Sequence, residues 1–411
     1  MALAKKGWTA NVQSPQFLKL KGDDPAGLGV GPIPAAPYYE PAYFDLEREA
    51  IFKRSWLQVG HVCELPEPGA FIVRELDFAG VSVLITHGKD GQIRAFHNVC
   101  THRGTQLVAD TSGKRGSFTC PYHAWTFGND GQLRSAPDIE RFYVQAKDCA
   151  LPKIAVDQCA GLIFVNLEPQ PKQSLRAFLG PYAAELETLP VARATTFSEY
   201  VYEIDANWKL AYDNFQENYH LRFIHPRSGR AAGGVDNPFG YPTQFGFNGP
   251  HRTQTIWSNP APEILPVQGF AFGKGFQYVA TDGYANAPNN RNYFALFPNF
   301  FILGNPGQHF SHCVTPISAT RSRGVIRLYW IGEDSTASQR FAREYSMATA
   351  LDIHAEDRAV IEAGQRGLSS GALKHIHFQS QEVLCRHLFH TVDQAVQAYR
   401  AELAEGAVIW I

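Results

Sequence analysis

The sequence predicts an α+β protein in which a small, strand-rich domain precedes a larger domain of helices packed on an antiparallel sheet. Short apolar runs separated by turn signals fill the region between residues 71 and 166. Beyond residue 170, helical patterns alternate with longer apolar runs. The chain has 411 residues, which is more than a typical single domain. Together these observations predict two to three domains.

The strand-rich domain is predicted from four apolar segments, at 71–75, 81–86, 93–97 and 162–166. Turn signals at 66–69 and 89–91 separate them, and Gly128-Asn129-Asp130-Gly131 is a strong hairpin signal. A short helix over 44–56 precedes this domain. Residues 1 to 40 are rich in Gly, Pro and Ala, so we expect an irregular arm there.

The second domain is predicted from a different pattern. Helices over 174–188 and 207–221 flank a strand over 197–204, and a region rich in Gly, Pro and Asn covers 226–292. Three apolar runs, at 293–303, 308–316 and 324–332, predict antiparallel strands, and helices over 336–366 and 392–404 close the chain.

Composition excludes several classes of protein. The net charge of −2 argues against a general nucleic-acid binder, which needs a concentrated basic surface. No stretch approaches the roughly 20 consecutive apolar residues of a membrane helix, and the first fifteen residues lack the apolar run of a secretory signal. We therefore expect a soluble, cytoplasmic protein.

Seven cysteines in such a chain do not predict a disulfide framework. Five of them lack ligand-like spacing and are interpreted as small buried hydrophobic residues: Cys63, Cys149, Cys159, Cys313 and Cys385. Cys100 and Cys120 differ, because each has a histidine close by.

The strongest signal in the chain is Cys100-Thr-His102, followed after seventeen residues by Cys120-Pro-Tyr-His123. In a Rieske [2Fe–2S] centre two cysteines hold one iron and two histidines hold the other. A Cys and a His in each loop supply one ligand to each iron, whereas a zinc finger groups Cys with Cys and His with His. The pattern predicts a Rieske cluster, with structural zinc as the alternative.

A Rieske cluster only transfers electrons, so the larger domain should hold an acceptor. Glu217 and His220 lie three residues apart, and a helix that ends before Pro226 could turn His225 back toward His220. Two histidines and one carboxylate on one face of Fe(II) leave adjacent positions open for dioxygen and substrate. The spacing predicts a mononuclear iron site.

With both motifs in this order, the sequence resembles the α subunit of the Rieske non-haem iron oxygenases, also called aromatic-ring-hydroxylating oxygenases. The resemblance spans residues 40–400 and implies an arm at 1–45, an all-β Rieske domain at 46–168 and a catalytic domain of the helix-grip (START-like) fold at 169–411. It implies that His220, His225 and a late carboxylate bind the iron. Asp357 matches best, with Asp352, Glu356 and Glu362 as rivals.

The resemblance also implies that Glu217 bridges an iron-ligating histidine and a cluster histidine of the adjacent subunit. The chain departs from the family pattern at two positions. Glu217 replaces the Asp common in arene dioxygenases, and Ala124 replaces the usual Gly after His123. A Glu bridge is seen in relatives that oxidise quaternary ammonium compounds.

The implied function is the oxygenase component of a multicomponent system. A reductase, with or without a ferredoxin, would pass NAD(P)H electrons to the cluster, and the iron would use O2 to hydroxylate an aromatic or related small organic substrate. Oxidative demethylation of a quaternary ammonium compound is the alternative, and a pure electron-transfer protein is the non-enzyme alternative.

The resemblance implies a homotrimer (α3) or an α3β3 assembly. Arg222 is a candidate partner for a carboxylate substrate, although a surface role suits it better.

Overall fold

The computed structural model describes residues 17–229, 232–257, 259, 261–275, 293–305, 308–332 and 334–408. They form two compact units, one of Phe52–Glu187 and one of the described residues in Met1–Ile51 and Thr188–Ile411. The domain limits predicted from the sequence stay predictions, and residues 1–16 of the predicted arm lie outside the described residues. No helix in the described part of the chain is long and apolar enough to cross a membrane.

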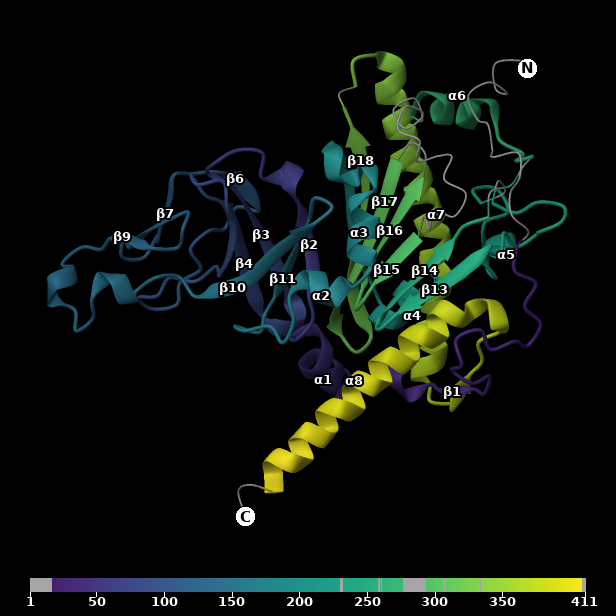
Figure 1. The fold of residues 1–411 in the computed structure, drawn as a ribbon, viewed down its shortest axis with the longest axis horizontal. Coiled ribbons are helices and arrows are strands. Elements are labelled where there is room, and N and C mark those ends of the chain that lie inside the picture. The colour runs from purple at the N-terminus through teal and green to yellow at the C-terminus, as the bar shows by residue number, and fades with distance from the viewer. Residues whose placement is uncertain are drawn as a thin grey trace. The chain divides into compact units, whose positions relative to one another are not determined.

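The Phe52–Glu187 unit is built on β-sheets (Figure 1). Within the described residues, one sheet has the strand order β2-β11-β10-β5-β4-β3-β6 and a smaller one has the order β7-β8-β9. The strands are β2 (Leu57–His61), β3 (Ala70–Leu76), β4 (Val81–His87), β5 (Ile93–His97), β6 (Ser112–Lys114), β7 (Ser117–Thr119), β8 (Thr126–Gly128), β9 (Leu133–Ser135), β10 (Lys153–Cys159) and β11 (Leu162–Asn166). All four strands predicted for this region are therefore confirmed.

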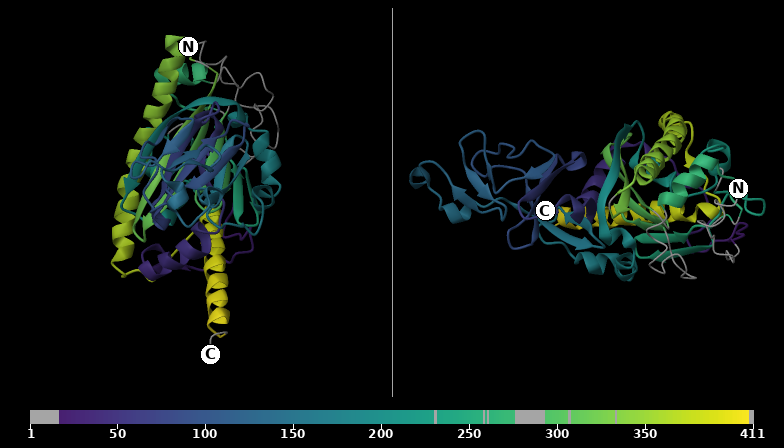
Figure 2. Two further views of the ribbon diagram at one scale, coloured as in Figure 1. Left: turned by 90° about the vertical axis from the view of Figure 1, so that its left-hand side faces the viewer. Right: turned by 90° about the horizontal axis from the view of Figure 1, so that it is seen from above.

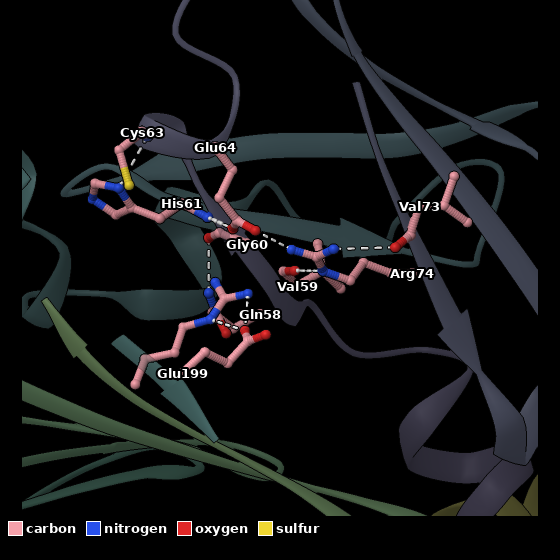
Figure 3. Close-up of polar contacts among 10 residues, drawn as sticks. Gln58, Val59, Gly60, His61, Cys63, Glu64, Val73, Arg74 and Glu199 are labelled. Carbon is pink, nitrogen blue, oxygen red and sulfur yellow. Dashed lines mark hydrogen bonds and ion pairs between the residues drawn. The ribbon is translucent and has the colours of Figure 1, made fainter. Parts of the chain in front are cut away.

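Local interactions hold the ends of these strands. The hairpin predicted at 128–131 joins β8 to β9, and Gly131 adopts a φ of +77° that favours glycine. Arg74 on β3 donates to the carbonyl oxygens of Val59 (2.8 Å) and Val73 (3.1 Å) and pairs with Glu64, as Figure 3 shows. The contacts tie β2 and the turn after it to β3. Two short helices, α2 (Leu175–Leu179) and α3 (Tyr182–Glu187), complete the unit.

The second unit contains an antiparallel sheet with the order β12-β18-β17-β16-β15-β14-β13 among its described residues. Its strands are β12 (Ala194–Ile204), β13 (Gln244–Asn248), β14 (His251–Thr255), β15 (Tyr293–Leu296), β16 (Phe300–Asn305), β17 (Gln308–Ser318) and β18 (Arg321–Ile331). The register places Tyr202, His312 and Phe301 on one face, because Tyr202 lies opposite Gly324, while His312 lies opposite both Ile326 and Phe301.

One long helix, α7 (Ala337–Ser369), lies along a face of this sheet in all three views (Figures 1 and 2). It begins with a capping box between Thr336 and Gln339, and Met347 packs against Leu328 and Trp330 of β18. The remaining helices are α4 (Trp208–Asp213), α5 (Leu221–Ile224), α6 (Pro266–Gly275) and α8 (Val383–Val408). A long helix on an antiparallel sheet confirms the predicted α+β class and the helix-grip expectation.

The described part of the N-terminal segment packs on this second unit. Ile33 and Pro34 form β1 (Ile33–Pro34), which pairs with β19 (His375–Ile376). Glu47 of α1 (Pro41–Glu47) forms an ion pair with Lys209 of α4 at 2.5 Å, and both side chains are fully buried. Trp208 donates to the same carboxylate at 3.0 Å. A buried pair of this kind fixes α4 and hence the start of the segment that carries the candidate iron ligands.

Two sequence predictions for this unit are wrong in detail. The helix predicted over 207–221 ends at Asp213, and the carboxylate of Glu217 then accepts the backbone N–H groups of Tyr219 and His220 before the short α5. The strand predicted over 293–303 is two strands, because Pro298 lies in the turn between them. The region rich in Gly, Pro and Asn at 226–292, for which no helix or strand was predicted, contains β13, β14 and α6, and residues 276–292 lie outside the described part.

Candidate metal centres

The two Cys/His loops have the same backbone hydrogen bonds. Cys100 N donates to Thr105 O (2.8 Å) and Gly104 N donates to Cys100 O (2.9 Å). In the second loop, the matching bonds join Cys120 N to Trp125 O (2.8 Å) and Ala124 N to Cys120 O (3.1 Å). Each loop therefore turns tightly enough to present a sulfur and an imidazole on the same side.

The fourth residue after each cysteine has a left-handed backbone. Gly104 has a φ of +80° and Ala124 has a φ of +55°. Glycine adopts this conformation at no steric cost, whereas alanine is strained there. The geometry explains why glycine is usual after His123 and shows that this chain keeps the loop at some cost.

Both cysteine sulfurs lie in the core of the strand-rich unit and receive backbone N–H groups. Burial raises the pKa of Cys100, although the N–H groups of His102 and Arg103 oppose it. Burial also disfavours the Cys120 thiolate, yet the N–H groups of Tyr122 and His123 bring its pKa below the usual value. N–H groups that donate to cysteine thiolates stabilise an iron–sulfur cluster and tune its reduction potential.

The two loop histidines lie side by side. The ring centroids of His102 and His123 are 4.6 Å apart, and Trp125 stacks on His102 at 5.0 Å. His123 Nδ1 is buried and makes no hydrogen bond to any described residue. A buried, unpartnered ring nitrogen in the loop that also carries Cys120 fits a metal ligand, so the four residues suit a Rieske cluster.

The second site forms where the segment after α4 meets α7. Glu217 binds Nδ1 of His220 through one carboxylate oxygen, which leaves Nε2 of His220 facing Asp357 Oδ1 at 3.5 Å. α5 ends at Ile224, as predicted from Pro226, and the ring centroids of His220 and His225 are 5.2 Å apart. The turn brings the two histidines together.

Two acceptor atoms face each other at the centre of this site. His225 Nδ1 is bonded to Glu356 Oε2 at 2.7 Å, so in the neutral imidazole Nε2 carries a lone pair, and this atom lies 2.9 Å from Asp357 Oδ1. Although the two atoms are this close, neither makes a hydrogen bond of proper geometry within the described residues. Burial would lower the pKa of His225, but Asp357 and Glu356 raise it above its ordinary value. The site therefore attracts a cation.

The ligand atoms of His220, His225 and Asp357 lie within 4.8 Å of one another, which suits a single metal ion. Among the predicted rivals, Glu356 binds the far nitrogen of His225, and Glu362 binds Arg358 at 2.9 Å. Asp352 is exposed. Asp357 is thus the carboxylate of α7 that faces both histidines. Arg222 is exposed, with its guanidinium 5.9 Å from the ring centre of Phe239.

Sequence reasoning missed a buried polar cluster next to this site. Tyr202 Oη lies 2.5 Å from His312 Nε2, and the Tyr202 ring is 3.9 Å from that of His354, one turn before Asp357 on α7. Burial lowers the pKa of His354 to about 4 and that of His312 further, which keeps both imidazoles neutral. The sequence offered one signal, the i,i+3 spacing of His354 and Asp357.

Comparison with known families assigns both units. Residues 55–154 match the Rieske [2Fe-2S] domain, and residues 191–398 match the catalytic domain of the ring-hydroxylating alpha subunit. The two matches contain the two candidate centres. The zinc-module and pure electron-transfer alternatives are therefore wrong.

Individual relatives agree with this assignment. The carnitine monooxygenase oxygenase subunit of Escherichia coli K12 is 35% identical over 82% of this chain and 84% of its own length. The toluate 1,2-dioxygenase subunit alpha of Pseudomonas putida is 28% identical over 82% of this chain and 81% of its own. A solved quaternary ammonium Rieske monooxygenase superposes with a TM-score of 0.74 and 26% identity, over 92% of this chain and 100% of that one. The chain belongs to the family of Rieske oxygenase α subunits, enzymes that carry a Rieske [2Fe–2S] cluster and a mononuclear iron.

Proposed function

We propose that this chain is the oxygenase component of a multicomponent enzyme that oxidises a small quaternary ammonium compound of the carnitine or betaine type. The observation that carries the substrate class is the 35% identity to a carnitine monooxygenase subunit over 82% of the chain. Glu217 supports the same class, because a glutamate bridge resembles that of relatives acting on quaternary ammonium compounds. This proposal favours the second of the two substrate classes expected from the sequence.

We further propose that Cys100, His102, Cys120 and His123 hold the cluster, and that His220, His225 and Asp357 hold Fe(II). The iron supplies the activation of dioxygen when it is bound. Glu217 accepts the Nδ1 proton of His220 and so directs Nε2 toward the metal. The burial of His225 (2% exposed) and Asp357 (1% exposed) excludes water from that side of the site.

An aromatic wall suits a cationic substrate. Phe215 lies two residues before Glu217, and its ring is 5.7 Å from Phe301 and 6.5 Å from Phe310. Phe215 and Phe310 are only partly buried, so part of their surface is accessible. A ring face attracts an alkylammonium group, by roughly 2 kcal/mol or more when water is excluded.

We propose that a reductase, with or without a ferredoxin, passes NAD(P)H electrons to the cluster. We propose a homotrimer or an α3β3 assembly, in which Glu217 links the iron-ligating His220 to a cluster histidine of the adjacent subunit. The cluster histidines are partly exposed in this chain, as a link to another subunit requires.

The test is a product screen with the purified, metal-loaded chain, a reductase and NADH. Carnitine, glycine betaine and choline are compared with benzoate, toluate and naphthalene, and products are identified by mass spectrometry. We expect turnover of a quaternary ammonium compound, and none from a His220→Ala variant. Conversion of only the aromatic compounds would contradict the proposal.

That opposite result would establish the second candidate, hydroxylation of an aromatic substrate. The match to the toluate dioxygenase subunit over 82% of the chain favours it, and the same aromatic wall suits stacking on an arene. Under this candidate the enzyme serves the catabolism of aromatic compounds.

A further inference from the structure

We propose that Glu356 is a positioning residue for the iron site, which fixes the tautomer and the direction of His225 and strengthens its bond to the metal. The proposal rests on the ligand set proposed above, in which Glu356 itself takes no place. It assigns a separate function to a residue that the sequence presented only as a rival ligand.

Both ring nitrogens of His225 face α7. Nε2 lies 2.9 Å from Asp357 Oδ1, and Nδ1 lies 2.7 Å from Glu356 Oε2. Successive residues of an α-helix point about 100° apart, so two adjacent carboxylates can reach opposite sides of one ring. The contact between Nδ1 and Glu356 has hydrogen-bond geometry, whereas the contact between Nε2 and Asp357 does not. Because a carboxylate accepts but does not donate, the proton of the neutral imidazole resides on Nδ1. The lone pair of Nε2 is left for the metal.

A second contact fixes Glu356 itself. The hydroxyl of Ser228 donates to Glu356 Oε2, the same oxygen that accepts from His225. The chain reaches this point by curling back after Pro226, since Gly229 N donates to His225 O at 3.1 Å. A Cβ on Gly229 would lie 2.7 Å from the Cβ of His225. Glycine is thus required for Ser228 to reach the carboxylate.

The arrangement gives each proposed histidine ligand its own glutamate. Glu217 serves His220 from three residues away, whereas Glu356 serves His225 from a helix 131 residues further along the chain. Glu356 is one-third exposed, while the His225 side chain is 1% exposed. The two glutamates therefore differ in function: Glu217 is the proposed link to the cluster, and Glu356 serves the iron alone. An acceptor behind a metal-bound histidine raises its basicity, and its loss typically weakens metal binding 10–100-fold.

The experiment measures iron affinity, independently of turnover. Apo-protein with an intact cluster is titrated with Fe(II), and the dissociation constant is measured for Glu356→Ala, Glu356→Gln and Ser228→Ala. We expect a rise of about 10–100-fold for the alanine variant. We expect a smaller rise for glutamine, which keeps an acceptor oxygen but no charge, and the smallest for Ser228→Ala. Glu344→Gln, an exposed position on the same helix, is the matched control.

Two further readouts separate positioning from general damage. The absorption of the Rieske cluster reports the integrity of the strand-rich unit, and circular dichroism reports that of the whole fold. The electron-spin signal of the ferrous site treated with nitric oxide reports the symmetry around the metal. We expect the cluster spectrum to stay unchanged and the nitrosyl signal to change its rhombicity in Glu356→Ala. The near-isosteric Glu356→Gln provides the same test if the alanine variant does not fold.

A His225→Ala variant distinguishes the two proposals. If it loses iron while Glu356→Ala and Glu356→Gln keep the parent affinity and the parent nitrosyl signal, the ligand set stands and the function of Glu356 is refuted. If His225→Ala binds iron as tightly as the parent, the ligand set itself is wrong.

Discussion

The two proposed metal centres of this chain are built in different ways. The four cluster residues lie between Cys100 and His123, on two loops with matching backbone hydrogen bonds. The three iron residues come from His220 and His225 on one segment and from Asp357 on a helix more than 130 residues later. The cluster site is thus set by local turns, and the iron site is set by the packing of α7 against the segment after α4.

Exposure does not separate the two centres in the same way. The cluster histidines His102 and His123 and the iron-site histidine His220 are partly exposed, whereas the two cluster cysteines are buried, as are His225 and Asp357. A centre that exchanges electrons with another protein has to lie near the surface, and a centre that activates dioxygen has to exclude water. Each proposed centre therefore has a buried side and a partly exposed side: the cluster site reaches the surface through its two histidines, and the iron site through His220.

The largest expected effect tests whether the centres are independent. His102→Ala should remove the Rieske absorption and leave the mononuclear iron in place, because the iron residues share no loop with the cluster. His220→Ala should do the reverse, and both variants should lose turnover completely. Metal analysis and absorption spectra of the two variants decide the matter, and loss of both metals from either variant would contradict the independence of the sites.

Lys209→Met tests how far the iron unit depends on distant packing. It leaves the buried Glu47 without its partner, and we expect the free energy of unfolding to fall by about 3–5 kcal/mol. The matched control is Lys114→Met, which breaks an exposed pair with Glu67 in the other unit and should cost less than about 1 kcal/mol. Urea unfolding measures the free energy of unfolding of both variants. Equal losses would show that the buried pair stabilises the protein no more than the exposed pair does.

Glu217→Gln tests the proposed link between the two kinds of centre. The variant keeps an acceptor for His220 Nδ1 but removes the charge, so both metals should stay bound while turnover falls about 10–100-fold. Single-turnover measurements of cluster reoxidation check whether electron transfer is the slowed step. Parent rates of reoxidation would refute the link.

The smallest effect concerns the difference between the two cluster loops. Ala124→Gly should stabilise the protein by about 1 kcal/mol, because it removes a strained left-handed alanine and makes the second loop match the first. Ala109→Gly, an exposed position outside the left-handed region, should destabilise it slightly instead. Thermal unfolding monitored by cluster absorption compares the two variants, and a lower midpoint for Ala124→Gly would show that the alanine is not strained.

Prediction from sequence succeeded where the signal is local. The strands at 71–75, 81–86, 93–97 and 162–166 and the hairpin at 128–131 were predictable from apolar runs and turn residues. It failed at 207–221, where the Glu217 carboxylate competes with the helix for backbone N–H groups. It also failed for β13 and β14, because they obtain their stability from neighbouring strands and not from their own pattern.

The sequence by itself predicted the proposed cluster site, since the spacing of Cys100, His102, Cys120 and His123 specifies both the candidate ligands and the turns that present them. It also predicted the pair His220 and His225, because Pro226 ends the short helix that lies between them. Only the tertiary structure decided which carboxylate of α7 faces them. Asp352, Glu356, Asp357 and Glu362 are chemically alike, and they differ only in the direction that the packed helix gives to each.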